Sequence, residues 1–225
     1  MTGARVVITG ASKGIGLALA GLLADTGDHP VGIARTAPKA FPGTFVAADL
    51  SDRHQTADAL AEILDAGPVD ALVNNVGLVR PATLGEVDLD DLAAVFDVNV
   101  RVAVQAVQAV LPGMLATGWG RIVNITSLVT VGMAERTAYG SAKAALEFCT
   151  RAWAAELAGT GVTVNAVAPG PTETELFRAN NAPGSDGEAR YLVKVPMRRF
   201  ATPREISAAV AFLLSDDAAF ITGHI

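Results

Sequence analysis

The segment RVVITGASKGIG, residues 5–16, joins a run of β-branched residues to a glycine-rich turn and then to the start of an apolar, helix-like stretch. Its first five residues predict a buried strand. Gly10, Gly14 and Gly16 permit a tight turn and let phosphate oxygens approach the backbone at a helix N-terminus. The segment therefore predicts a strand, a pyrophosphate-binding turn and a helix in succession. An ordinary glycine turn without a ligand is the alternative interpretation.

Outside this segment, short β-branched runs alternate with amphipathic stretches. Strands that are apolar on both faces and separated by helices indicate parallel pairing, with helices on both sides of the sheet. The predicted fold class is therefore α/β, doubly wound, with a parallel sheet of six to seven strands. We expect strands at residues 5–9, 30–34, 44–48, 69–74, 121–126 and 162–167, and helices near residues 15–26, 52–65, 88–116, 137–158 and 203–215.

Composition narrows the class of protein. The chain has 225 residues, of which 51% are hydrophobic and 18% charged, which suits one compact domain over residues 1–225. A net charge of −6 without a basic cluster disfavours binding to nucleic acid or to an anionic membrane. One cysteine, Cys149, allows no intramolecular disulfide, and neither a leader segment nor an apolar run of membrane-spanning length is evident. We expect a cytoplasmic protein.

The least regular stretch of the sequence is residues 169–200, which contains PGPTETE, NNAPGSDGE and VPMRRF. A long irregular segment in a compact domain is most often a functional lid or a flexible loop. We therefore expect these residues to cover a substrate site. The three histidines are scattered, with no Asp or Cys at ligand spacing, so the sequence predicts no metal site.

Polar residues follow several of the predicted strands. Ligands of open α/β sheets bind at the carboxyl ends of strands, where this chain has NNVG (74–77), NITS (124–127) and PGPTET (169–174). Simple strand-end or Asx turns explain each of these equally well on local grounds. Asn99 interrupts the apolar stripe of the helix predicted at 88–116, and a buried amide there must find partners in backbone or water.

The segment YGSAK, residues 139–143, holds one of only two tyrosines in the chain. Residues at i and i+4 share one face of a helix, so the phenol of Tyr139 and the ammonium of Lys143 point the same way. A packing tyrosine beside a solvated lysine is the alternative interpretation of this segment.

The motifs singled out so far, taken in sequence order, resemble those of the short-chain dehydrogenase/reductase family over essentially the whole chain. They are TGASKGIG, NNVG, Asn99, Ser127, YGSAK and PGPTET.

This resemblance implies a Rossmann-type fold that binds NAD(H) or NADP(H), and a catalytic set of Asn99, Ser127, Tyr139 and Lys143. In it, Tyr139 is the proton donor or acceptor, and the adjacent cation of Lys143 is expected to lower the phenol's pKa toward neutrality. Lys143 also binds the nicotinamide ribose, Ser127 donates to the substrate oxygen, and Asn99 holds a relay water. The implied cofactor contacts are Gly10, Ser12, Lys13, Ile15, Gly16, Arg35, Asp49, Leu50, Asn75, Val76, Gly77, Tyr139, Lys143, Pro169, Gly170, Thr172 and Thr174.

The choice between the two cofactors follows from charge. NAD sites of this type place Asp or Glu about 20 residues beyond the glycine motif, but residues 29–48 contain no acid. Arg35 follows the second predicted strand, and Lys13 lies in the glycine turn. Two cations without a carboxylate favour the 2′-phosphate of NADP(H) over NAD(H). The alternative is that Arg35 is a solvated surface residue.

Apolar residues next to the site predict a hydrophobic carbonyl substrate: Leu78, Val79, Val129, Val131, Met133, Leu176 and Phe177. We expect an NADP(H)-dependent carbonyl reductase or alcohol dehydrogenase for small or medium ketones. The first alternative is a 3-oxoacyl-(acyl-carrier-protein) reductase, because VPMRRFATPREI (195–206) resembles a segment of those enzymes. The others are an NAD-linked sugar or polyol dehydrogenase and a non-catalytic NADP(H)-sensing protein.

Family members usually continue past ITG into a last strand, so the C-terminal strand is expected to be cut short at ITGHI. A homotetramer or dimer through helices 88–116 and 137–158 is a further family expectation.

Overall fold

A computed structural model describes residues 3–225 and shows a six-stranded parallel sheet with the strand order β3-β2-β1-β4-β5-β6. The strands are β1 Arg5–Thr9, β2 His29–Ala34, β3 Thr44–Ala47, β4 Ala71–Asn74, β5 Gly120–Ile125 and β6 Val162–Val167. The order reverses at β1, because β2 and β3 extend to one side and β4, β5 and β6 to the other. This confirms the doubly wound α/β fold and places its switch point between β1 and β4.

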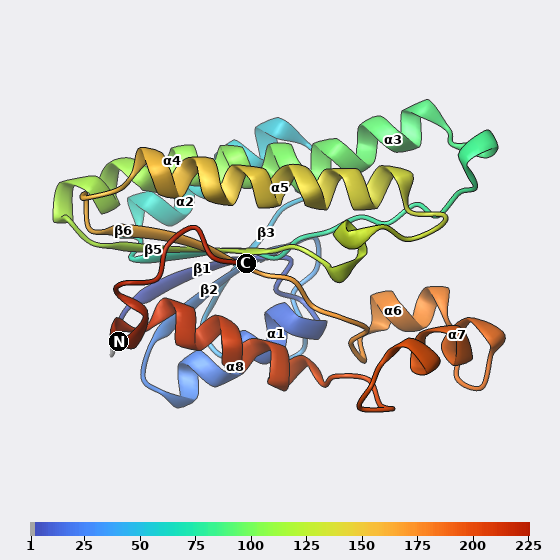
Figure 1. Ribbon diagram of the computed structural model, residues 1–225. Coiled ribbons are helices and arrows are strands. Elements are labelled where there is room, and N and C mark those ends of the chain that lie inside the picture. The colour runs from blue at the N-terminus through green and yellow to red at the C-terminus, as the bar shows by residue number, and fades with distance from the viewer. Residues whose placement is uncertain (1–2) are drawn as a thin grey trace.

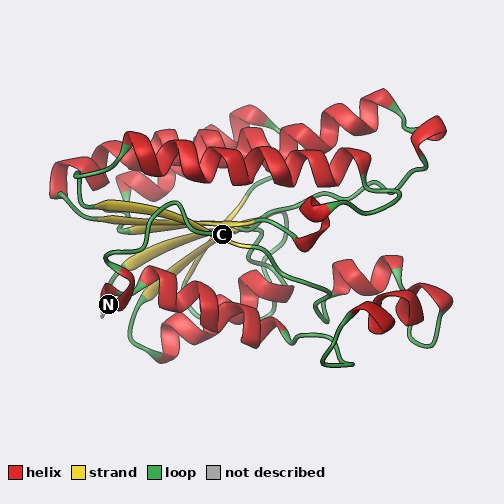
Figure 2. Cartoon of the chain, in the orientation of Figure 1, coloured by secondary structure: helices red, strands yellow, loops and turns green. Residues whose placement is uncertain are grey.

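Helices cover both faces of the sheet (Figures 1 and 2). On one face lie α1 Gly14–Asp25 and α8 Pro203–Leu214, and on the other lie α2 Arg53–Asp65, α4 Val102–Thr117 and α5 Thr137–Glu156. Successive side chains of a strand point to opposite faces, so Val6 and Ile8 of β1 join the core under α1 and α8, whereas Val7 joins the other core. Both faces of β1 are therefore buried, as its apolar sequence predicts.

The helix predicted at residues 88–116 is divided by a wide turn. It consists of α3 Leu89–Phe96, one π-helical turn at Asp97–Arg101, and α4. A π turn inside an α-helix is rare and occurs frequently at functional sites. By length and composition alone the stretch Leu89–Thr117 could cross a membrane, with a mean hydropathy of 1.4 over an 18-residue window, although charged residues interrupt it and 44% of that window is buried inside the fold. Its α4 part packs in the core against β4, β5 and α2.

Residues 169–200 are more regular than predicted, since they contain α6 Glu175–Asn180 and α7 Asp186–Lys194 (Figure 1). Thr174 and Ser185 cap the two helices through their side-chain oxygens. Arg178 joins the helices by pairing with Glu173 and, over 2.6 Å, with Glu188. Local capping and ion pairs therefore order a segment whose composition indicates a loop.

The C-terminal residues run along β6 on the edge away from β5. Gly223 N donates to the carbonyl of Val164 over 2.7 Å, and Ala166 N donates to the carbonyl of His224 over 2.8 Å. Residues 221–225 thus occupy the position of the expected seventh strand without being part of a strand. Short 3-10 turns complete the fold at Leu84–Glu86, Leu128–Val131 and Asp216–Ala218.

Candidate active site

A cleft of about 1440 Å³ lies at the carboxyl ends of the strands and extends to the helices α6 and α7. It begins at the glycine turn after β1 and includes residues that follow β2, β3, β4, β5 and β6. All the predicted cofactor contacts line it except Gly16. The seven apolar residues expected around the substrate also line it. The fold therefore gathers residues from across the whole sequence at one edge of the sheet.

The glycine turn is shaped for close backbone approach. Gly10 has a φ of 69°, in the left-handed region that favours glycine. A Cβ at Gly16 would lie 2.6 Å from the carbonyl oxygen of Gly10, which explains why a residue outside the cleft must be glycine. Helix α1 begins at Gly14. No side chain of residues 3–225 caps its N-terminus by a hydrogen bond, and its first turn contains no acidic residue. Its N–H groups suit a phosphate group, so the residues present fit a dinucleotide.

Asn75 holds this turn in place from the neighbouring strand. Its side-chain amide donates to the carbonyls of Thr9 and Gly10 over 2.9 and 3.0 Å, and its backbone N–H donates to the hydroxyl of Thr9 over 3.0 Å. The sequence left open whether the amides of NNVG bond backbone or a cofactor. In the structure the side-chain amide of Asn75 makes both of its hydrogen bonds to backbone carbonyls, so its part in a cofactor site is to shape the turn.

Ser127, Tyr139 and Lys143 line the same part of the cleft. Ser127 follows β5, and Tyr139 and Lys143 lie in the first two turns of α5. The Nζ atom of Lys143 is 5.7 Å from the centre of the Tyr139 ring and donates to the carbonyl of Ile125 over 2.7 Å. Lys143 is only 2% exposed, so α5 presents a buried ammonium beside the phenol.

Burial, rather than the charge of a neighbouring cation, is the main cause of the pKa shifts of Tyr139 and Lys143. It raises the pKa of Tyr139 to about 12, an increase that a hydrogen bond with Ser127 and the charge of Arg136 oppose only in part. Burial also lowers the pKa of Lys143 to about 8. The expected lowering of the phenol's pKa toward neutrality by Lys143 was therefore wrong for the protein without cofactor. A neutral phenol beside a charged lysine suits proton donation to a carbonyl oxygen at neutral pH.

Asn99 lies behind the cleft rather than in its lining, in the π-helical turn between α3 and α4. Its amide nitrogen donates to the carbonyls of Leu78 and Val95 over 2.9 and 2.8 Å, as expected for a buried amide. Its Oδ1 is buried without a partner among the described residues. A Cβ at Gly77 would lie 3.2 Å from this Oδ1 and 3.8 Å from Lys143 Nζ, so both atoms face the same point. A water there would satisfy Oδ1 and reach the lysine.

The charged residues at the other end of the cleft come from neighbouring strand ends. Lys13 lies in the glycine turn and Arg35 follows β2, and Gly10 N donates to the carbonyl of Ile33 over 2.8 Å, which keeps the two segments together. Hydrogen bonds from the backbone and side chain of Ser51 lower the pKa of Asp49, and the charge of Arg35 lowers it further. Lys13 and Arg35 are both exposed within the cleft.

Sequence reasoning missed several residues that line the cleft, among them Arg136, Tyr191 and Lys194 near the predicted substrate residues. Arg136 precedes Tyr139 by one helical turn, and its guanidinium donates to the hydroxyl of Tyr191 over 3.1 Å. Tyr191 also packs edge-to-face on Phe177, with ring centres 5.3 Å apart. Tyr191 is the second of the chain's two tyrosines, and that rarity was the available signal. Its pairing with Arg136 spans 55 residues, which no local pattern reveals.

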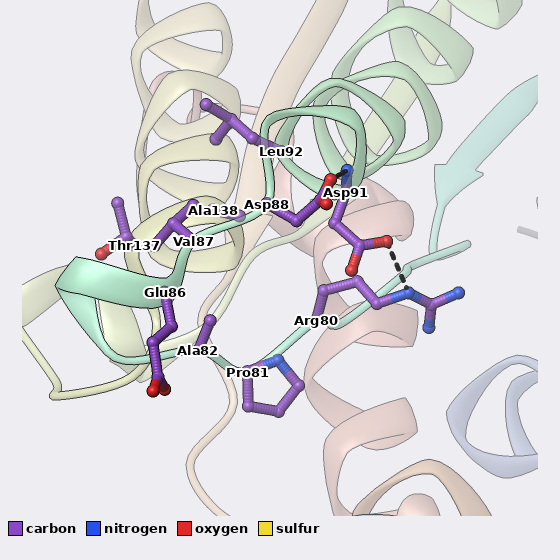
Figure 3. Close-up of a pocket in the computed structure, with 10 residues that line it drawn as sticks. All are labelled: Arg80, Pro81, Ala82, Glu86, Val87, Asp88, Asp91, Leu92, Thr137 and Ala138. Carbon is purple, nitrogen blue, oxygen red and sulfur yellow. Dashed lines mark hydrogen bonds and ion pairs between the residues drawn. The ribbon is translucent and has the colours of Figure 1, made fainter.

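A smaller pocket of about 140 Å³ lies beside the first turn of α5 (Figure 3). The guanidinium of Arg80 pairs there with Asp91, Nε to Oδ1 over 3.1 Å, and Asp88 caps α3 through the backbone N–H of Asp91 over 3.0 Å. An ion pair and a helix cap therefore account for Arg80, Asp91 and Asp88 in this pocket, and its remaining charged residue, Glu86, accepts from the hydroxyl of Thr83 over 2.8 Å. Arg80 also reaches the mouth of the large cleft, but with its charge matched by Asp91.

Comparison with known proteins identifies relatives over the full chain. Residues 10–225 match the family model for Enoyl-(Acyl carrier protein) reductase. The 3-oxoacyl-(acyl-carrier-protein) reductase FabG of Vibrio harveyi is 38% identical, over 100% of this chain and 95% of its own. A crystal structure of a proposed NAD(P)-dependent gluconate 5-dehydrogenase from Beutenbergia cavernae, with bound NADP at low occupancy, is 35% identical, with a TM-score of 0.93 over 100% of this chain and 94% of that chain. The aldohexose dehydrogenase of Thermoplasma acidophilum is 27% identical, with a TM-score of 0.91 over 99% and 91%.

Proposed function

The chain belongs to the short-chain dehydrogenase/reductase family of NAD(P)-dependent oxidoreductases that act on CH–OH and carbonyl groups, and we propose that it is an NADP(H)-dependent carbonyl reductase. The observation that carries this proposal is the meeting of Ser127, Tyr139 and Lys143 in one cleft, next to a glycine turn that fits a dinucleotide. A protein that only senses NADP(H) would have no need of these three side chains together.

The chain's own residues divide the work of carbonyl reduction. The bound nicotinamide supplies the hydride when a ketone is reduced. Tyr139, neutral at pH 7, donates its proton to the substrate oxygen, and the hydroxyl of Ser127 donates a hydrogen bond to the same oxygen. The charge of Lys143 favours the phenolate that remains. Asn99 Oδ1 and Lys143 Nζ face a common point, where a water could return a proton.

We favour NADP(H) over NAD(H) because of the charges beside β2. Arg35 and Lys13 line this end of the cleft, and residues 29–48 contain no acid that would bond a 2′-hydroxyl and repel a 2′-phosphate. A guanidinium matches the geometry of a phosphate and carries a full positive charge. A related structure contains NADP, which is consistent with this choice.

The proposed substrate is a free small or medium carbonyl compound. The relatives' names favour a second candidate, a 3-oxoacyl group on an acidic carrier protein, which needs exposed basic residues for docking. Arg121 is 3% exposed, with its guanidinium 4.5 Å from the centre of the Trp119 ring. Arg199 forms a two-bond ion pair with Glu205. Neither of these two residues offers a free charge to a carrier, whereas Arg198 and Arg204 are exposed and form no ion pair within residues 3–225, which supports the second candidate.

The test compares kcat/KM for a carrier-bound 3-oxoacyl substrate with kcat/KM for free alkyl and aryl ketones, each with NADPH and with NADH. We expect the free ketones and NADPH to be preferred. A large advantage for the carrier-bound substrate that disappears at high salt would establish the second candidate instead. Oxidation of sugars or polyols with NAD⁺ would support a sugar or polyol dehydrogenase, which two of the structural neighbours favour by name.

We further propose that residues 1–225 act as one domain, with 169–200 as the substrate lid, in a cytoplasmic homo-oligomer. Support for a soluble domain comes from the long apolar helix, whose α4 part is packed against the sheet. Support for oligomers comes from exposed apolar side chains on the outer helices, including Phe148 of α5, which is 71% exposed, and Leu115 of α4.

A further inference from the structure

Arg136 is held in a fixed place at the substrate end of the cleft. The preceding residue, Glu135, has a φ of 62°, a left-handed conformation that is unfavourable for a residue other than glycine. The N–H of Ala82 donates to the carbonyl of Glu135 over 3.3 Å, and Ala82 also forms a bridge with Arg136. Such a conformation persists only where the surroundings hold it, and it occurs frequently at functional sites.

The guanidinium of Arg136 has hydrogen-bond partners but no carboxylate. It donates to the hydroxyl of Tyr191 over 3.1 Å and to the carbonyl of Glu135 over 3.0 Å, both of which are neutral. Within residues 3–225, no carboxylate lies at ion-pair distance from it, whereas Arg80, which also lines the cleft, pairs with Asp91. A guanidinium has five N–H donors in a fork that matches a carboxylate, so donors of Arg136 remain for a ligand.

Other charges make this end of the cleft positive. Lys194 lies one helical turn after Tyr191 on α7 and also lines the cleft. The acidic residues that line the cleft lie away from Arg136. They are Asp49 after β3, Asp97 beside Arg53 and Arg101, and Glu175 beside Gly14 of the glycine turn. The charge of Arg136 is near enough to Tyr139 to oppose the rise in the pKa of the phenol.

From this arrangement we infer that Arg136 binds a carboxylate of the substrate while Ser127 and Tyr139 bind its ketone oxygen, so that the substrate is a short oxo acid. Tyr191 positions the guanidinium, and the apolar lining receives the alkyl or aryl part. This inference rests on the proposed function and narrows its substrate class from small or medium carbonyl compounds in general to those that carry a carboxylate.

The test measures kcat/KM with NADPH for acetoacetate, levulinate and their methyl esters, which differ from the acids in charge and by one methyl group. We expect the wild-type protein to prefer at least one acid to its ester by about tenfold or more, the scale of a hydrogen bond to a charged group. Arg136→Gln should lower kcat/KM for that acid by about tenfold to a hundredfold, mainly through KM, and change the ester by less than about twofold. Arg136→Lys should retain part of the preference.

Arg190→Gln is the matched control, because Arg190 lies on α7, exposed and outside the cleft lining, and the change removes the same charge. It should leave the ratio of acid to ester unchanged. Turnover of the ester reports that each variant is folded. If Arg136→Gln does not fold, Arg136→Lys and Tyr191→Phe provide the test, and an acid preference equal to wild type in both would overturn the inference.

A binding measurement separates this inference from the proposed function. Calorimetric titration of levulinate into the protein with NADP⁺ should show binding that weakens about tenfold or more in Arg136→Gln. Binding without turnover of any ketone would contradict the proposed function and leave the carboxylate site standing. Equal turnover of acids and esters by wild type, equal losses on both in Arg136→Gln, or no carboxylate binding would each overturn the inference and leave the carbonyl reductase intact.

Discussion

Replacing Lys143 with Met should stabilise the cofactor-free protein near pH 7 while removing its activity. Burial lowers the pKa of Lys143 from 10.5 to about 8, and this difference corresponds to about 3 kcal/mol of unfavourable free energy for holding the charge in the fold. Met has a similar length and suits an apolar site, but it loses the hydrogen bond to the carbonyl of Ile125, worth about 1 kcal/mol. The net gain is about 2 kcal/mol, or a rise in Tm of roughly 4–8 °C for a chain of this length.

The pH dependence identifies the cause. The pKa of Lys143 is lower in the folded than in the unfolded state, so the cost is full below about pH 8, declines as pH rises to 10.5, and is absent above. Urea unfolding of both proteins at about pH 7 and about pH 10 should therefore show the advantage of the Met variant shrinking with pH. Lys39→Met, at an exposed lysine, should change stability little. A Met variant less stable than wild type at pH 7, or a difference independent of pH, would refute this reasoning.

Three further outcomes are expected. Tyr139→Phe should lower turnover at least about a hundredfold while NADPH still binds, because the variant loses only the positioned proton donor, and near wild-type turnover would remove Tyr139 from the mechanism. Ala34→Asp combined with Arg35→Ser should shift the ratio of kcat/KM toward NADH, since both residues line the cofactor end of the cleft; tighter binding of NADH than NADPH by the unmodified protein would contradict the charge argument. For ketone reduction, kcat/KM should be constant around pH 7 and fall above about pH 8 as Lys143 loses its proton, whereas a profile flat to pH 10 would show that this charge is not required.

The sequence by itself was sufficient for the fold class and for about half of the residues that line the cleft. The run at 5–9 is apolar on both faces and is followed by glycines, so a buried parallel strand and a tight turn follow from residue type alone. Six strands were predicted, and their observed ends differ from the predicted ones by at most two residues. The i, i+4 spacing of Tyr139 and Lys143 needed only a helix, and α5 provides it.

Tertiary structure decided what local spacing cannot encode. The pKa values of Tyr139 and Lys143 depend on how far the folded chain buries the two side chains, so the expected direction for the phenol was wrong although both residues lie in the cleft. The π turn at Asp97–Arg101 sets where Asn99 points, and it has no marker in the sequence pattern. Arg136 and Tyr191 become a pair only because tertiary packing brings α7 near the N-terminus of α5, since contacts between residues 55 positions apart arise from packing and not from periodicity.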